Sequence, residues 1–275
     1  MRVPFVKMHG LGNDFVILDE RRGALPPLSR FTRAALADRH QGIGCDQLIL
    51  LQPSERTDLR MRVFNPDGRE AGACGNATRA VGLLEGGALT IETVGGLVTA
   101  RPDAAGIQVD MGVPTFDWQA IPLAYAMDTA ALPVGWGELR DPAAVNVGNP
   151  HVVFFVEDVD AVPLGELGAQ IENDALFPEG VNVNIAQATG RAALKLRVWE
   201  RGAGLTKACG TGACATTVAA LRRKLVRSPV TVTLPGGDLH IAWDGHGSIT
   251  MTGPAAESFR GSFRLEDFAI EEDRT

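Results

Sequence analysis

The sequence has few cysteines, few aromatic residues and no long apolar run. Its four cysteines in 275 residues are too sparse for a disulfide framework, and no C-x-x-C pair indicates a zinc site. No apolar run approaches the roughly 20 residues of a membrane span, and the N-terminus lacks the charged and apolar regions of a signal peptide. We therefore expect a cytoplasmic protein that has no metal site and does not bind membranes.

A basic tract is also missing. The formal net charge is −7, and the short cluster at 222–227 is the longest basic stretch, so nucleic acid is not an expected partner. The composition, with 45% hydrophobic and 21% charged residues, is that of a soluble globular protein. A chain of this length fits one large domain or two domains of about 100 to 150 residues, and we favour two.

An internal repeat supports two domains. Residues 59–64 (LRMRVF) match 194–199 (LKLRVW), and 73–80 (ACGNATRA) match 208–215 (ACGTGACA), so that Cys209 follows Cys74 by 135 positions. The segments GNDFVILD at 12–19 and GNPHVVFF at 148–155 are also similar, 136 positions apart. We predict two pseudo-symmetric lobes, 1–115 and 116–255, with the tail 256–275 completing the first.

Each copy contains many short strand-like runs around one helix. Short β-like apolar runs predict strands, for example at 15–18, 47–51, 61–64, 89–93 and 97–100, and then at 152–156, 181–186, 193–200, 230–234, 239–243 and 248–252. Stretches rich in Ala, Leu and Val predict buried helices at 77–84 and 213–221. Gly86-Gly87 and the basic run 222–224 mark the ends of these helices.

The sequence around two of the cysteines favours a role in chemistry. Cys74 and Cys209 each precede a predicted helix and are each followed by a glycine. The N–H groups and positive dipole at a helix start stabilise an anion, which lowers a thiol pKa and offers a carboxylate site. A duplicated packing cysteine is the alternative. Cys45 and Cys214 have no counterpart in the other copy, so packing is their expected role.

Two thiols related by a pseudo-two-fold axis suit inversion at a Cα atom. One thiolate would remove the proton from one face while the opposite thiol delivers a proton to the other. The developing charge would flow into the substrate carboxylate, where the N–H groups of the helix starts stabilise it. The repeat therefore predicts a cofactor-independent amino-acid epimerase.

Five motifs occur in order along essentially the whole chain: MHGLGNDFVILD at 8–19, FNPDG at 64–68, ACGNATR at 73–79, GNPH at 148–151 and WERGAGLTKACGTGACA at 199–215. In these motifs the chain resembles the diaminopimelate epimerase family. The resemblance implies interconversion of LL- and meso-2,6-diaminopimelate in lysine and peptidoglycan precursor biosynthesis, without pyridoxal phosphate or metal. It also implies an α+β fold, in which each lobe is a mixed sheet rolled into a barrel around a central helix, and a homodimer.

The resemblance also implies the site residues. Cys74 and Cys209 take the two acid/base positions, and His151 and Glu200 assist them by accepting a thiol proton, pairing with a thiolate or, for Glu200, holding an ammonium group. The implied substrate ligands are Asn13, Gln47, Asn65, Gly75, Asn76, Asn149, Asn182, Glu200, Arg201, Gly210 and Thr211. Asn13 and Asn149 also lie in ordinary turn signals. Ala77 stands where the family usually has a glycine, and we expect catalysis to survive this change.

Four other functions are compatible with parts of this pattern. A proline or hydroxyproline racemase of the same superfamily also uses two cysteines, but a ring substrate would leave Arg201 and the asparagines unpaired. A non-catalytic ligand-binding relative or a phenazine-type isomerase would lack the cysteine pair. A thiol-redox protein would need a disulfide between Cys74 and Cys209.

Overall fold

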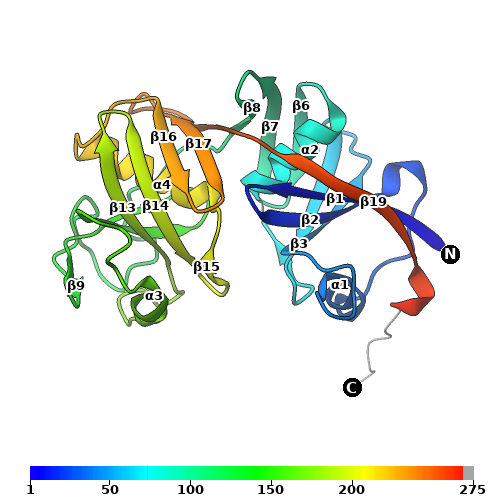
Figure 1. The fold of residues 1–275 in the computed structure, drawn as a ribbon, viewed down its shortest axis with the longest axis horizontal. Helices are drawn as coiled ribbons and strands as arrows, with labels where there is room; N and C mark the ends of the chain where they lie inside the picture. The colour runs from blue at the N-terminus through cyan, green and yellow to red at the C-terminus, as the bar shows by residue number, and fades with distance from the viewer. Residues whose placement is uncertain (73, 269–275) are drawn as a thin grey trace. The chain divides into compact units, whose positions relative to one another are not determined.

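The computed structural model describes residues 1–72 and 74–268, which form two compact units (Figure 1). The first unit comprises Met1–Val109 and the segment that begins at Pro254, and the second comprises Asp110–Gly253. Ala73 and the last seven positions of the predicted tail, 269–275, lie outside the described residues.

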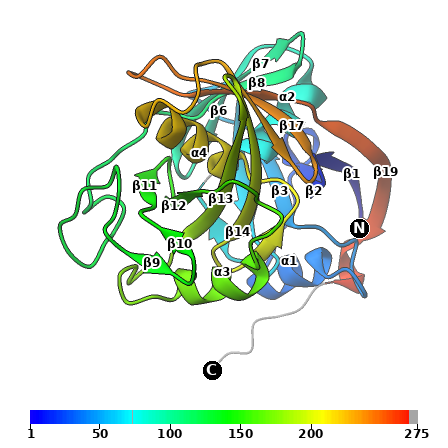
Figure 2. The ribbon, with the colours of Figure 1, turned by 60° about the vertical axis from the view of Figure 1, so that its left-hand side comes forward.

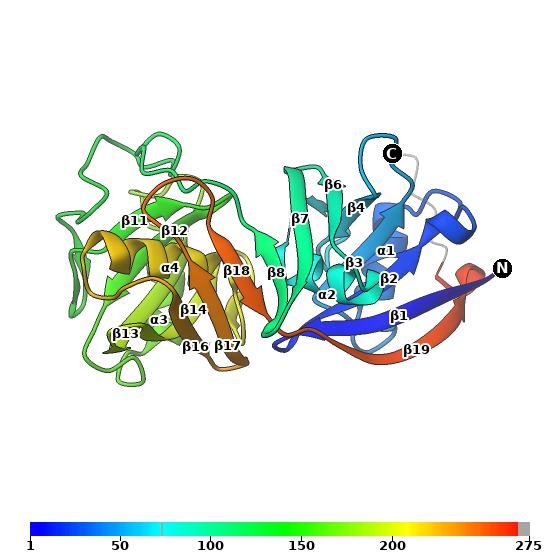
Figure 3. The ribbon, with the colours of Figure 1, turned by 90° about the horizontal axis from the view of Figure 1, so that it is seen from above.

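The first unit is built on a mixed sheet. Its strands are β1 (Arg2–Gly10), β2 (Asn13–Asp19), β3 (Gln47–Gln52), β4 (Leu59–Phe64), β5 (Glu70–Ala71), β6 (Leu89–Thr93), β7 (Gly96–Asp103), β8 (Gly106–Asp110) and β19 (Ala256–Arg264). Its helices are α1 (Arg30–Ala37) and α2 (Gly75–Glu85), with short 3-10 turns η1 (Glu20–Arg22) and η2 (Leu265–Asp267). The strands are ordered β19–β1–β2–β3–β4–β6–β7–β8, with β5 paired to β4. Strand β19 runs antiparallel beside β1 although the two are at opposite ends of the chain (Figure 3).

The second unit repeats this arrangement. Its strands are β9 (Gly135–Trp136), β10 (Leu139–Arg140), β11 (Ala143–Asn146), β12 (Pro150–Phe155), β13 (Asn182–Gly190), β14 (Ala193–Glu200), β15 (Gly204–Thr206), β16 (Val230–Leu234), β17 (Gly237–Ala242) and β18 (Thr250–Gly253). Its helices are α3 (Leu164–Glu172) and α4 (Gly210–Arg222). The main sheet is ordered β11–β12–β13–β14–β16–β17–β18, with β15 paired to β14, and α4 packs against it (Figure 2).

Strand directions are duplicated as well. In the first unit β2 and β3 are parallel, β3 and β4 antiparallel, and β4 and β6 parallel. The pairs β12–β13, β13–β14 and β14–β16 follow the same sequence of directions. Each predicted strand and both predicted helices overlap an element of the structure. Both units therefore combine α-helices with a mixed β-sheet.

The expectation of one helix in each copy is wrong. Helices α1 and α3 lie in the connections between the parallel pairs β2–β3 and β12–β13. Neighbouring parallel strands need a long crossover, which is usually helical, whereas the sequence pattern does not reveal that these strands are parallel. Helix α1 is eight residues long and begins after Ser29, whose side chain accepts a hydrogen bond from the Thr32 N–H. Among the other strands, β1, β5, β8, β9, β10, β11, β15 and β19 overlap none of the predicted ranges.

Each unit has its own apolar core. In the first, side chains from β1, β2, β3 and α1 pack with Phe263 and Leu265 from the C-terminal segment. In the second, side chains from β12, β13 and α3 pack with the loop residues Leu132 and Phe177. None of the helices in the part of the chain that the structure describes is long and apolar enough to cross a bilayer.

Candidate active site

Cys74 is the N-cap residue of α2. Its backbone is extended (φ −145°, ψ 112°), and its Sγ accepts a hydrogen bond from the Ala77 N–H at 3.4 Å. The helix starts at Gly75, two residues earlier than predicted, so the glycine and Asn76 form its first turn. Ala77 supplies the capping N–H, so the alanine at this position leaves the cap intact.

A chain of side-chain amides leads away from Cys74. Asn13 Oδ1 lies 3.9 Å from Cys74 Sγ and accepts from Asn76 Nδ2 at 3.1 Å. Arg79, which is fully buried, donates from Nη2 to Asn76 Oδ1 at 3.0 Å, and Asn13 Nδ2 donates to Asp46 Oδ2 at 3.0 Å. Arginine only donates hydrogen bonds and a carboxylate only accepts them, so Arg79 at one end and Asp46 at the other fix the orientation of the Asn76 and Asn13 amides.

Charged residues hold Asp46 in place. Arg39 bridges Asp46 and Asp14 with contacts of 2.5 Å and 2.6 Å, and Lys7 pairs with Asp14 at 2.5 Å. Burial raises the pKa of Asp14, but hydrogen bonds from Arg39 and Lys7 outweigh it and hold the pKa well below its usual range. The carboxylates beside Asn13 are therefore anchored, and Asn13 with them.

Gln47 and Asn65 form a second pair of amides in this unit. Gln47 lies at the start of β3 and Asn65 directly after β4, and Nε2 of the glutamine is 3.5 Å from Oδ1 of the asparagine. Gln47 Oε1 is buried and has no hydrogen-bond partner among the described residues. It is thus an acceptor available to a ligand.

Cys209 is the N-cap residue of α4 and matches Cys74. Its backbone is extended (φ −124°, ψ 109°), and Sγ accepts from the Gly212 N–H at 3.4 Å, with Thr211 Oγ1 at 3.5 Å. Burial, followed by the charge of Glu200, raises the pKa of the Cys209 thiol well above its usual value, despite the bonds from Thr211 and Gly212. The expectation that a helix start lowers the thiol pKa is wrong here, because desolvation of a thiolate outweighs the hydrogen bonds.

Glu200 is the last residue of β14 and lies beside this thiol. Its carboxylate raises the Cys209 pKa through its charge and through a hydrogen bond with the thiol. Thr206, on the paired strand β15, donates from Oγ1 to Glu200 Oε1 at 2.6 Å. The carboxylate can thus accept the thiol proton while Thr206 fixes its position.

His151 is fully buried between two amides. Its Nε2 lies 2.9 Å from Asn149 Oδ1, and its Nδ1 lies 3.1 Å from Asn184 Nδ2. Burial lowers the pKa of the ring to about 3, so His151 is neutral at physiological pH. Both ring nitrogens are therefore occupied by amide groups.

Asn182 and Arg201 form the last contact group. Asn182 Nδ2 donates to the Pro150 carbonyl at 2.8 Å, and its Oδ1 accepts from the Arg201 N–H at 2.9 Å. Arg201 Nη1 donates to the Glu179 carbonyl at 2.8 Å. An amide has a second hydrogen and a second lone pair, so Asn182 retains capacity for a ligand.

Comparison with known proteins agrees with the resemblance. The model of the diaminopimelate epimerase family matches residues 5–116 and 143–257. The chain is 66% identical to a diaminopimelate epimerase from Erythrobacter litoralis, over 98% of this chain and all of the relative. It is 58% identical to one from Rhizorhabdus wittichii, over 98% of this chain and 99% of the relative. The chain belongs to the diaminopimelate epimerase family.

Solved structures with low identity share the fold. A phenazine biosynthesis protein of the PhzF family from Enterococcus faecalis superimposes with a TM-score of 0.70 at 14% identity, covering 96% of this chain and all of that one. A hydroxyproline epimerase from Agrobacterium vitis gives a TM-score of 0.67 at 18% identity, covering 95% of this chain and 91% of that one. At such identities the likeness shows the fold alone, in agreement with membership of the diaminopimelate epimerase family.

Within each unit, some of the predicted site residues contact one another, and the others form separate pairs. Cys74, Asn13 and Asn76 form one group, and Cys209 lies with Glu200 and Thr211. Gln47 with Asn65, Asn149 with His151, and Asn182 with Arg201 form separate pairs.

Sequence reasoning missed four residues whose side chains contact this set in the described part of the chain: Asp46, Arg79, Asn184 and Thr206. A usable signal existed for Asn184, because it lies two positions after Asn182 on one strand and therefore on the same face. Asp46 directly precedes Gln47, but no spacing in the sequence connects it with Asn13.

Other candidate groups do not add to the site. Cys45 and Cys214 are 2% and 0% exposed, in agreement with packing roles, and burial raises the pKa of Cys45 to about 11. No cluster of three or more His, Cys, Asp or Glu suited to a metal ion occurs among the residues that the structure describes.

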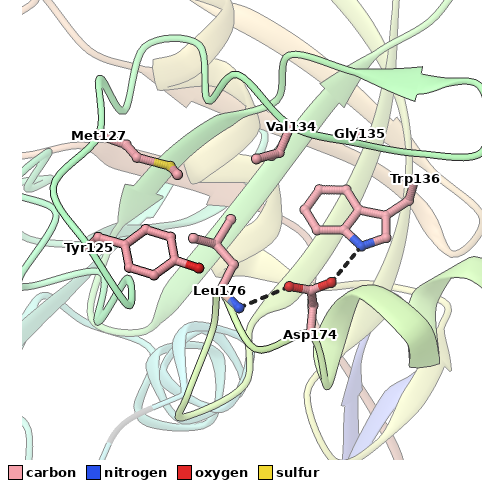
Figure 4. Close-up of a pocket in the computed structure, with 7 residues that line it drawn as sticks. All are labelled: Tyr125, Met127, Val134, Gly135, Trp136, Asp174 and Leu176. Carbon is pink, nitrogen blue, oxygen red and sulfur yellow. Dashed lines mark hydrogen bonds between the residues drawn. The ribbon is translucent and has the colours of Figure 1, made fainter.

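A surface pocket of about 320 Å³ in the second unit contains none of the motif residues (Figure 4). It is lined by Tyr125, Met127, Val134, Gly135, Trp136, Asp174 and Leu176. Both oxygens of Asp174 already accept hydrogen bonds, from the Trp136 indole at 3.0 Å and the Leu176 N–H at 2.9 Å. We assign it no ligand.

Proposed function

We propose that this chain interconverts LL-2,6-diaminopimelate and meso-diaminopimelate by a two-base mechanism in which Cys74 and Cys209 are the acid and base. Family membership and the relatives of 66% and 58% identity support the substrate. The observation that carries the mechanism is the equivalence of the two thiols. Each is an N-cap whose sulfur accepts a hydrogen bond from the third following residue at 3.4 Å.

The proposed reaction needs one thiolate and one thiol, on opposite faces of the same Cα atom. The thiolate takes the Cα proton, the electron pair moves into the carboxylate, and the thiol then delivers its own proton to the opposite face. Inversion thus leaves the two cysteines with exchanged protonation states. Two similar bases suit a reaction whose directions are near mirror images.

The surroundings of Cys209 suggest its protonation state before substrate binds. Its pKa is raised by burial and by Glu200, so this thiol is protonated in the free protein and serves as an acid. For the opposite direction, the proton of Cys209 passes to Glu200, whose carboxylate is held by Thr206. Glu200 is therefore an auxiliary base in this proposal.

The first turns of α2 and α4 are the proposed sites of charge stabilisation. Helix geometry leaves the first N–H groups of a helix without intrahelical acceptors. In this proposal the substrate carboxylate meets the first turns formed by Gly75 and Asn76 in α2 and by Gly210 and Thr211 in α4. Donors aimed at the carboxylate stabilise the charge that develops there when the proton leaves Cα.

The remaining motif residues are proposed substrate ligands. Asn13, Gln47, Asn65, Asn149 and Asn182 would bind the ammonium and carboxylate groups, with Arg201 pairing the distal carboxylate. His151 contacts Asn149 rather than a thiol in this structure, so its proposed part is to hold that amide. No cofactor takes part in the proposed reaction.

We also propose the finer architecture that the family implies. The two units would be the copies of the duplicated segment, lobe 1–115 with tail 256–275 and lobe 116–255, each rolled into a barrel around α2 or α4. Contacts of α4 with strands across its sheet, from β11 to β17, support this for the second lobe. A homodimer would be tested by sedimentation of the purified protein.

Isotope exchange tests the reaction directly. Incubating the protein with LL-diaminopimelate in deuterium oxide should give meso product carrying deuterium at the inverted Cα. Cys74→Ser and Cys209→Ser should each lose inversion, because one face then lacks its thiol. Cys214→Ser is the matched control, since a serine hydroxyl inside α4 can bond to a backbone carbonyl one turn earlier.

Two results would contradict the proposal. Full inversion by either single variant would show that the two thiols are not the acid and base. Turnover of L-proline or trans-4-hydroxy-L-proline in place of diaminopimelate would assign the chain to the proline-type racemases.

A further inference from the structure

Asn184 is a fully buried amide in β13 that none of the family motifs includes. Its Nδ2 lies 3.0 Å from the Val152 carbonyl, 3.4 Å from the Asn182 carbonyl and 3.1 Å from His151 Nδ1. A carbonyl oxygen only accepts hydrogen bonds, so the two backbone carbonyls require the NH2 end of Asn184 to face them and the ring.

This orientation determines the tautomer of His151. Because Asn184 donates, His151 Nδ1 must accept, and the proton of the neutral ring must lie on Nε2. Nε2 therefore donates to Asn149 Oδ1, at 2.9 Å. The NH2 end of Asn149 then points away from the ring, and no group among the described residues accepts a hydrogen bond from it.

We propose that Asn184 is a positioning residue that holds His151 in its Nε2–H tautomer and thereby turns the NH2 group of Asn149 toward a substrate carboxylate. The part that concerns substrate rests on the proposed function, in which Asn149 is a ligand. The part that concerns the tautomer does not. A turned Asn149 would instead present its carbonyl oxygen, which repels a carboxylate.

Packing around the other end of Asn184 supports a role for the amide. Its Oδ1 is buried without a hydrogen-bond partner among the described residues, which is unfavourable for folding. A Cβ atom on Gly212 would lie 2.7 Å from this oxygen, so only glycine fits there without a shift. On grounds of stability alone, leucine would suit position 184. The amide differs from leucine in supplying an NH2 group, and this group is what contacts His151.

The second contact of Asn184 connects it with the catalytic thiol. Gly212 is the residue whose N–H caps Cys209 Sγ. Asn184 therefore lies between the His151 ring on one side and the first turn of α4 on the other.

Nitrogen NMR of the whole protein with ¹⁵N-labelled histidine tests the tautomer. The wild type should show His151 as a single neutral ring protonated on Nε2 at pH 7, with the signal assigned by its loss in His151→Phe. Asn184→Leu should give a mixture of tautomers, because nothing then requires Nδ1 to accept. Thr217→Val is the matched control, since it also replaces a buried polar atom that lacks a partner in this unit.

Kinetics with LL-diaminopimelate tests the effect on Asn149. Asn184→Leu should raise KM about tenfold, the usual effect of losing one hydrogen bond to a charged group, while kcat changes less than about threefold. Thr217→Val should alter neither constant. A general loss of folding would instead lower the active fraction and leave KM unchanged.

The outcomes separate this inference from the proposed function. A wild-type His151 protonated on Nδ1, or on both nitrogens at pH 7, would overturn the inference whatever the activity. An altered tautomer with an unchanged KM would overturn the role in substrate orientation. A protein that shows the expected tautomers without turning over diaminopimelate would refute the proposed function and support the tautomer lock.

Discussion

Replacing His151 should change how the stability of the protein depends on pH. The ring is fully buried and its pKa lies at about 3, against 6.5 for an ordinary histidine. The variant His151→Phe is suitable because GNDF in the first copy places Phe15 where GNPH places His151 in the second. Phenylalanine keeps a ring of similar shape and removes the titration.

Proton linkage determines the sign and size of this change in stability with pH. Below pH 6.5 the unfolded chain binds a proton at this histidine, while the folded protein does not until about pH 3, so the free energy of unfolding falls as the pH falls. The slope is about 1.4 kcal/mol per pH unit well below pH 6.5. From pH 7.5 to pH 5.0 the wild type should therefore lose about 2 kcal/mol more than the variant.

Urea unfolding followed by tryptophan fluorescence measures this difference. All four tryptophans, at positions 118, 136, 199 and 243, lie in the second unit with His151, so the signal reports on the relevant part of the chain. The variant leaves Asn149 and Asn184 without their ring partner, which lowers its stability at every pH. The acidic residues and the other histidines titrate in both proteins and cancel in the comparison.

Parallel pH curves for the two proteins would refute this reasoning. So would an NMR titration in which the His151 ring gains its proton near pH 6.5. Either result would mean that the ring is solvated or paired with an acid in solution.

Three further predictions concern other parts of the chain. Gly212→Ala should lower the free energy of unfolding by about 1–3 kcal/mol in the same urea assay, because the new Cβ would lie 2.7 Å from an amide oxygen of β13. Gly165→Ala is the control, since its new Cβ would have its nearest contact at 3.7 Å and the change should be neutral or stabilising. Ser29→Ala should lower the free energy of unfolding by about 1 kcal/mol, because α1 loses its N-cap. Circular dichroism is the suitable probe, since the first unit contains no tryptophan, and an unchanged stability would show that the cap is unimportant. Asp46→Asn should raise KM for diaminopimelate several-fold, since Asn13 then loses the carboxylate acceptor that Arg39 anchors, and an unchanged KM would contradict that role.

Much of the fold could be predicted because it is encoded in short stretches of sequence. Short apolar runs predicted strands such as β3 and β16, and the small-residue stretches predicted α2 and α4. Helices α1 and α3 escaped because their existence follows from the parallel pairing of strands that are distant in sequence. Pairing partners are not visible in a local pattern.

The sequence by itself determined the placement of the two cysteines. A Cys-Gly pair before a run of helix-forming residues is local information, and the 135-residue repeat shows that it occurs twice. The family follows from the same motifs. Both thiols are N-caps in the structure, as this pattern predicts.

Only the tertiary structure decided the chemical state of the groups around them. Burial and Glu200 raise the pKa of Cys209, opposite to the expectation from its helix start, and burial keeps His151 neutral. The direction of each amide depends on partners such as Asp46 and Asn184, brought in from other strands. Desolvation and hydrogen-bond direction depend on what surrounds a group in space, and a linear pattern of residues does not contain that information.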